Sequence, residues 1–133
     1  MRTKLYAAAL GLVLLGMPAV AKDKITTHQV HFQKGTSSAT MKGSVKGYDT
    51  VLYKLGAKAG QTMRVSIDSK HANFNVYAPG KGMGDQALFL GEPGIPYVGK
   101  LPADGTYTIS VYLMRNEARR GTTAPFTLHA EVK

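Results

Sequence analysis

The sequence predicts an all-β fold, a small antiparallel β-sandwich of about seven or eight strands. Apolar and polar residues alternate in segment after segment, which is the period of a strand with one buried face. Turn-forming residues separate these segments at spacings close to the ~8–12 residues typical of sandwich strands. No window shows a convincing helical period. These observations favour two packed sheets, each with one apolar face.

Each alternating segment is expected to be a strand because its side chains point to two opposite faces. In chain order the segments are 25–32, 39–45, 51–55, 63–67, 74–78, 107–113 and 126–132. The apolar sets in the later six are Ala39, Met41, Gly43 and Val45; Val51, Tyr53 and Leu55; Met63, Val65 and Ile67; Phe74, Val76 and Ala78; Tyr107, Ile109, Val111 and Leu113; and Phe126, Leu128, Ala130 and Val132. Between them lie turns such as P-A-D-G at 102–105, where glycine can supply a positive φ.

One connection, at residues 79–96, is long, irregular and rich in glycine and proline. We expect it to cross from one sheet to the other, and its length makes it a candidate functional loop, although a disordered tip is an equally good interpretation. The nearest candidates for a helical turn are residues 85–90 and 116–120. Neither is long enough for more than a turn or two.

The first 21 residues have the pattern of a secretory signal peptide. Arg2 and Lys4 precede an uncharged apolar run at 7–16, and residues 19–21 (A-V-A) have the small-x-small form of a cleavage site. A membrane anchor is the weaker interpretation, because the apolar run is shorter than the ~20 residues that a span needs. We therefore expect a signal peptide at 1–21, cleaved after Ala21, and a single exported domain at 22–133 with no membrane anchor.

The composition limits how the domain is held together and what it meets. The chain has no cysteine, so an exported domain of this size depends on its core rather than on disulfides. Its net charge of +9 becomes +7 without Arg2 and Lys4, because all eight acidic residues follow residue 21. A basic protein can meet nucleic acid, anionic lipid or an acidic protein surface, and net charge does not choose among them.

The sequence gives no pattern for a metal, a cofactor or a catalytic centre. His28 and His31 are three apart on an expected strand, which puts them on opposite faces, and His71 and His129 stand alone. The acidic residues are isolated from one another, and no G-x-S-x-G motif, cysteine nucleophile or phosphate loop is present. We therefore expect no enzyme activity, no metal site and no cofactor.

The remaining candidates are binding residues. Three arginines fall within six residues at 115–120, and tyrosine and arginine are the side chains most often found at interface hot spots. Tyr48 lies in a K-G-Y-D turn, where an exposed anchor and a buried core ring are equally good interpretations. Tyr107 is in phase with the inward-facing Ile109 and Val111, which favours a core position.

Five short motifs resemble, in their order and spacing, those of the bacterial periplasmic lysozyme inhibitors. The resemblance is closest to the inhibitors of goose-type (g-type) lysozyme, with the inhibitors of invertebrate-type (i-type) lysozyme as near relatives. It covers residues 30–133 and is weakest at 81–100. The motifs are K-G-T-S-S-A at 34–39, K-G-Y-D at 46–49, G-Q at 60–61, L-P-A-D-G-T-Y at 101–107 and R-N-E-A-R at 115–119.

In that family a Ser-Gly-x-Tyr loop enters the substrate cleft of the lysozyme. The aligned residues here run from Asp104 and Gly105 to Tyr107, so an aspartate replaces the serine. An ionised carboxylate only accepts hydrogen bonds, whereas a hydroxyl also donates them. It would also bring negative charge towards a cleft that carries a catalytic glutamate, so the resemblance implies tighter binding for Asp104→Ser.

The resemblance also implies that Tyr48 and Arg115 match contact positions of the g-type inhibitors. Arg119 is carried over as a further contact or as a brace for its loop. The implied function is occlusion of a lysozyme cleft by a periplasmic protein that performs no chemistry and binds no nucleic acid. The alternative is an exported, non-catalytic β-sandwich module that binds carbohydrate or peptidoglycan.

Overall fold

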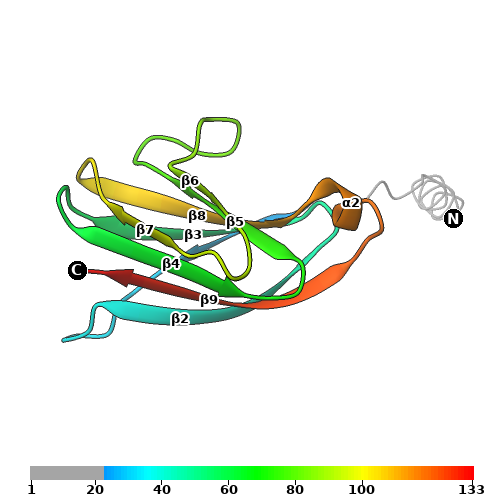
Figure 1. The fold of residues 1–133 in the computed structure, drawn as a ribbon, viewed down its shortest axis with the longest axis horizontal. Coiled ribbons are helices and arrows are strands. Elements are labelled where there is room, and N and C mark those ends of the chain that lie inside the picture. Colours follow the sequence, from blue (N-terminus) through cyan, green and yellow to red (C-terminus); the bar gives the residue numbers. More distant parts are fainter. Residues whose placement is uncertain (1–22) are drawn as a thin grey trace, which may run out of the picture.

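A computed structural model describes residues 23–133 and confirms the all-β sandwich. Two sheets of five and four strands lie face to face, and one short helix, α2, lies at one end (Figure 1). The expected signal peptide and its cleavage site lie outside the described residues. No helix in the described part of the chain is long and apolar enough to cross a membrane.

The five-stranded sheet has the order β1-β3-β8-β5-β6. Its strands are β1 (Ile25–Gln29), β3 (Thr50–Ala57), β8 (Gly105–Leu113), β5 (Ala72–Tyr77) and β6 (Phe89–Gly91). β8 pairs antiparallel with β3 on one side and with β5 on the other, whereas β1 pairs parallel to β3. The alternating segment at 107–113 therefore forms the centre of this sheet.

The four-stranded sheet has the order β2-β9-β4-β7. Its strands are β2 (Ser38–Lys46), β9 (Thr123–Val132), β4 (Thr62–Asp68) and β7 (Tyr97–Lys100). All its pairings are antiparallel. The chain passes from the five-stranded to the four-stranded sheet between β6 and β7. The crossing expected within residues 79–96 is therefore made by its last part, residues 92–96.

The core lies between the inner faces of the sheets, and the predicted apolar sets supply most of it. Leu55, Met63, Phe74, Tyr107 and Leu128 are completely buried. Two rings lie against glycines on the neighbouring strand. A Cβ at Gly91 would come within 2.4 Å of the Phe74 ring, and a Cβ at Gly43 within 2.7 Å of the Phe126 ring, so these glycines leave room for the rings.

The 79–100 region differs in detail from what the sequence predicts. Residues 23–133 form nine strands, close to the seven or eight expected, and β6 and β7 are the two that the alternating segments did not include. Residues 85–88 are irregular and 89–90 already belong to β6, so the candidate helical turn at 85–90 was wrong, whereas the one at 116–120 overlaps α2 (Arg115–Ala118). β6 and β7 have three and four residues, too few for an alternating pattern to identify them.

Candidate functional site

The predicted contact residues do not form one site, because β8 separates them. Gly105 begins β8 opposite Ala57, while Val111 near its other end lies opposite Val51, just after the turn that carries Tyr48. Eight residue steps of a strand, from Gly105 to Leu113, span about 27 Å. The loop at 104–105, called the D-G loop below, therefore lies at one end of the sandwich. Tyr48 and Arg115 of α2 lie at the other end (Figure 1).

The D-G loop is a tightly fixed turn. The Asp104 carboxylate accepts a hydrogen bond of 2.7 Å from the backbone N–H of Ala59, in the β3–β4 turn. Gly105 has φ 139°, and a Cβ there would lie 2.9 Å from the Cβ of Pro79. Both the backbone angle and the close approach require glycine. Asp104 thus braces two turns against each other.

Tyr107 lies behind this loop and has no exposed surface. Its hydroxyl donates a hydrogen bond of 2.7 Å to the carbonyl of Ala103 and accepts one of 3.2 Å from the N–H of Ala103. The core position indicated by its phase is confirmed. The expectation that its side chain contacts a partner conflicts with this burial, and the geometry gives it the role of shaping the loop from inside.

Tyr48 is exposed at the tip of the β2–β3 turn, at 51% of its surface. Gly47 adopts φ 59°, and its N–H donates to the carbonyl of Thr122 at 2.9 Å, which ties the turn to the segment after α2. Of the two interpretations that the sequence left open, the structure therefore supports the exposed ring. Tyr48 and α2 are held at the same end.

The helix α2 presents two guanidinium groups to solvent. The N–H of Arg119 donates to the carbonyl of Arg115 at 2.9 Å, which places the two side chains one turn apart. Both residues are exposed, while Ala118 between them is buried in the core. Arg120 pairs with Glu117 at 3.8 Å, but among residues 23–133 no carboxylate lies within 4 Å of Arg115 or Arg119. Two cations are thus available to a partner.

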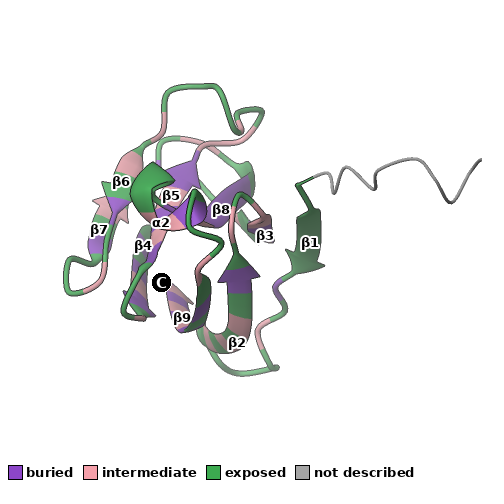
Figure 2. Ribbon diagram, turned by 90° about the vertical axis from the view of Figure 1, so that its right-hand side faces the viewer, coloured by how far each residue is buried: buried purple, intermediate pink, exposed green. Residues whose placement is uncertain are grey.

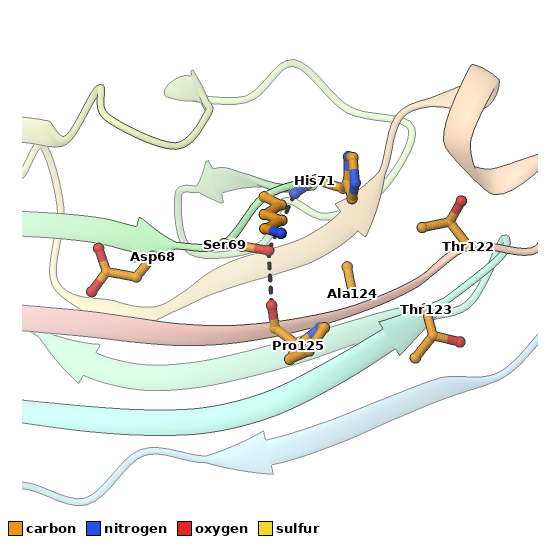
Figure 3. Close-up of a pocket in the computed structure, with 8 residues that line it drawn as sticks. Asp68, Ser69, His71, Thr122, Thr123, Ala124 and Pro125 are labelled. Atoms are coloured by element: carbon orange, nitrogen blue, oxygen red, sulfur yellow. Dashed lines mark hydrogen bonds between the residues drawn. The ribbon is translucent and has the colours of Figure 1, made fainter.

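Glu117 holds this arrangement together, and the sequence analysis missed it. Its carboxylate accepts a hydrogen bond of 2.8 Å from the Thr122 hydroxyl and lies 3.7 Å from the ring of His71. His71 belongs to the β4–β5 turn and Thr122 to the start of the β9 segment, and both line a groove of about 620 Å³ beside α2 (Figure 3). The sequence signal that pointed to a pairing role for Glu117 was its spacing of three residues from Arg120.

The outer face of the four-stranded sheet carries a chain of hydrogen bonds that has the residue types of a catalytic triad. The Thr40 hydroxyl lies 3.1 Å from Nδ1 of His129, and Nε2 of His129 lies 3.2 Å from the Asp68 carboxylate. Asp68 is 80% exposed, so water screens the pair. Electrostatic stabilisation of a transition state is strongest where water is excluded, and this open face does not exclude it.

Histidines of the described residues make local contacts. No group of three or more histidine, cysteine, aspartate or glutamate side chains in residues 23–133 is placed to hold a metal ion. His28 stacks on the ring of Tyr53, with centroids 5.3 Å apart. His28, His71 and His129 each contact a neighbouring side chain of the protein itself.

The sequence was compared with known proteins. No family model matches it. A protein of Escherichia coli (strain K12) described as an inhibitor of g-type lysozyme is 35% identical over 130 residues, which cover 95% of this chain and 94% of that protein.

Solved structures agree with this relative. The periplasmic lysozyme inhibitor of g-type lysozyme from Aeromonas hydrophila is 50% identical and superposes with a TM-score of 0.81, covering 84% of this chain and all of that one. The corresponding protein of Salmonella Typhimurium is 31% identical, with a TM-score of 0.66 over 81% of this chain and 98% of its own. The chain belongs to the family of g-type lysozyme inhibitors.

This family consists of inhibitors, not enzymes, which agrees with the open, water-screened polar face described above. The resemblance read from the five motifs is thereby confirmed at the level of the family.

We predict that Glu117→Ala lowers the free energy of unfolding of this family member by about 1.5–3 kcal/mol, because a hydrogen bond to a charged group is lost from a site where the Glu117 side chain is 18% exposed. Glu117→Gln should lose less, since an amide oxygen still accepts from Thr122. Urea denaturation measures both changes.

The matched control is Glu131→Ala. Glu131 also lies near two basic groups, Arg64 and Lys133, but it is more exposed and no hydroxyl donates to it. Its removal should cost less than about 1 kcal/mol. Equal losses for Glu117→Ala and Glu131→Ala would contradict the role given to Glu117.

Proposed function

We propose that this protein is a periplasmic inhibitor of g-type lysozyme that blocks the substrate cleft of the enzyme without any chemistry of its own. Family membership supports the target class. The observation that carries the proposal is the end of the sandwich where Arg115, Arg119 and the ring of Tyr48 are exposed together. Figure 2 looks onto this end, with the exposed helix α2 towards the viewer.

The contact chemistry follows from the charges. A lysozyme cleft carries a catalytic glutamate, and a guanidinium presents its N–H groups in a planar fork that matches a carboxylate. Arg115 is the best placed to make this pair, with Arg119 one turn further on. Tyr48 adds a large ring with few rotatable bonds, which is a favourable anchor at an interface. Occlusion needs only that these groups fill the space of the substrate.

The loop at 104–105 is the weaker candidate for the occluding element. Asp104 brings a negative charge, which an acidic cleft repels, and its carboxylate already accepts the hydrogen bond from Ala59. The distance of about 27 Å along β8 also keeps this loop from entering a narrow cleft together with Arg115. We therefore place the primary contact at the α2 end.

Direct inhibition assays test the function. The purified protein should protect peptidoglycan from g-type lysozyme, inhibit i-type lysozyme less, and release no sugar or peptide by itself. Retention on insoluble peptidoglycan without protection from any lysozyme class would favour the alternative, a non-inhibitory carbohydrate-binding module, and would overturn the proposal.

Single substitutions decide which end of the molecule binds. Arg115→Ala should weaken binding by about 2–5 kcal/mol, because it leaves a desolvated carboxylate on the enzyme without a partner. Tyr48→Ala should cost about 2 kcal/mol or more if the ring is a central anchor. Titration calorimetry with g-type lysozyme measures both losses, and Lys34→Ala, on the exposed β1–β2 turn, is the neutral control.

Asp104→Ser tests the other end in the same assay. The family resemblance implies tighter binding for this variant, whereas contact at the α2 end alone implies unchanged affinity and a small loss of stability. A pattern in which Arg115→Ala and Tyr48→Ala fold normally and bind like the parent while Asp104→Ser weakens binding would transfer the contact to the D-G loop.

We also propose that residues 1–21 direct export and are removed, so that residues 22–133 form the single mature domain. The protein recovered from the periplasm should then begin at Lys22. Intact-mass measurement of the periplasmic and membrane fractions checks this. A chain that keeps Met1 in the membrane fraction would show that the segment is an anchor.

A further inference from the structure

A groove of about 320 Å³ lies on the outer face of the five-stranded sheet, directly beside Tyr48. Tyr48 and the residues that follow it form one wall. Met83, from the connection between β5 and β6, forms the opposite wall. Tyr48 and Met83 are both about half exposed, at 51% and 48%, so the groove opens to solvent between two accessible apolar side chains.

The floor of the groove is rigid and uncharged. The Tyr112 hydroxyl donates to the side-chain carbonyl of Asn75 at 2.9 Å, and the Asn75 amide donates to the Tyr77 hydroxyl at 3.1 Å. Burial raises the pKa of Tyr112 above its ordinary value, and the neighbouring Tyr77 raises it further, while the hydrogen bond from Tyr112 to Asn75 opposes the shift. Tyr112 therefore stays neutral at physiological pH.

The wall that carries Met83 is shaped by short turns. Gly80 and Gly84 adopt positive φ angles of 81° and 96°. The Asp85 carboxylate accepts the N–H of Gly82 at 2.9 Å, and the N–H of Asp85 returns to the carbonyl of Gly82. Met83 lies inside this reciprocal pair of bonds, so its backbone is fixed while its unbranched side chain can adapt to what it meets.

The charges around the groove restrict its occupant. Its one acidic residue, Asp49, accepts a hydrogen bond of 2.8 Å from the N–H of Lys24, which engages that carboxylate within the protein. The rest of the lining is uncharged, with the neutral polar residues Thr50, Asn75 and Ser110 beside tyrosine, methionine and leucine side chains. The space between the exposed walls Tyr48 and Met83 therefore fits an apolar side chain best.

We infer that this groove is a second part of the lysozyme-binding surface and takes an apolar side chain from the rim of the lysozyme cleft, with Met83 as its movable wall. The inference rests on the proposed function, because the groove is continuous with that surface through Tyr48. It assigns a role to the 79–88 part of the long loop. The arginines supply charge pairing at the centre, and the groove supplies apolar burial beside it.

The test uses the whole mature protein and purified g-type lysozyme. Met83→Asp places a charge where an apolar side chain must lose water, and should raise Kd about tenfold or more. Met83→Leu keeps the volume and the apolar character and should restore Kd to within about threefold of the parent. Val98→Asp is the matched control, because Val98 is equally exposed, at 50%, but belongs to β7 of the other sheet.

Circular dichroism and urea denaturation on each variant confirm that the fold is intact. Equal Kd values for Met83→Asp and Val98→Asp, while Arg115→Ala still weakens binding, would overturn the groove and leave the proposed function standing. Failure of the parent protein to inhibit g-type lysozyme would overturn the proposed function itself. A second check is Tyr112→Phe, which removes the hydroxyl bond to Asn75 and should weaken binding less than Met83→Asp does.

Discussion

The pairing of β8 with strands on both sides is the constraint on which the molecule depends. β3 and β5 both bond to it, and its inward side chains Tyr107, Ile109 and Val111 have no exposed surface. A strand that is held on both edges and on its inner face cannot bend freely. The length of β8 therefore sets the distance between the two loops that flank it. One end carries a turn braced by Asp104, and the other carries α2.

Each end is tied to a neighbouring turn by polar contacts that belong to different parts of the chain. Tyr107 and Asp104 fix the first end through Ala103 and Ala59. At the second, Glu117 reaches Thr122 and His71 while Gly47 bonds to Thr122. The tips are therefore presented in fixed positions. A surface ordered before binding loses less conformational entropy when it meets its partner, which favours affinity.

The sequence was sufficient for the fold class and the core, because alternation is a local property that each strand carries by itself. It missed β6 and β7, which are short strands at the outer edges of the two sheets and depend on partners such as Phe74 and Arg64 for their pairing. The motifs identified the family. They did not show that Asp104 and Arg115 lie at opposite ends. The ten residues between them hold the two side chains far apart only if this segment is one straight strand. Glu117 was missed because His71, its partner, lies on a distant turn.

The distribution of charge gives the two ends different parts in recognition. The protein is strongly basic, so an acidic cleft would attract it from a distance, and added salt would weaken that attraction. Long-range attraction does not orient the molecule. Orientation comes from short-range pairing between a cation and a carboxylate. At the α2 end Arg120 is neutralised by Glu117 while Arg115 and Arg119 have no such partner in the described chain. At the other end the tip residue is an acid. Under the proposed function, Arg115 and Arg119 make the α2 end the more favourable one to meet an acidic cleft, whereas the tip of the other end presents Asp104, with Lys58 in the adjacent turn.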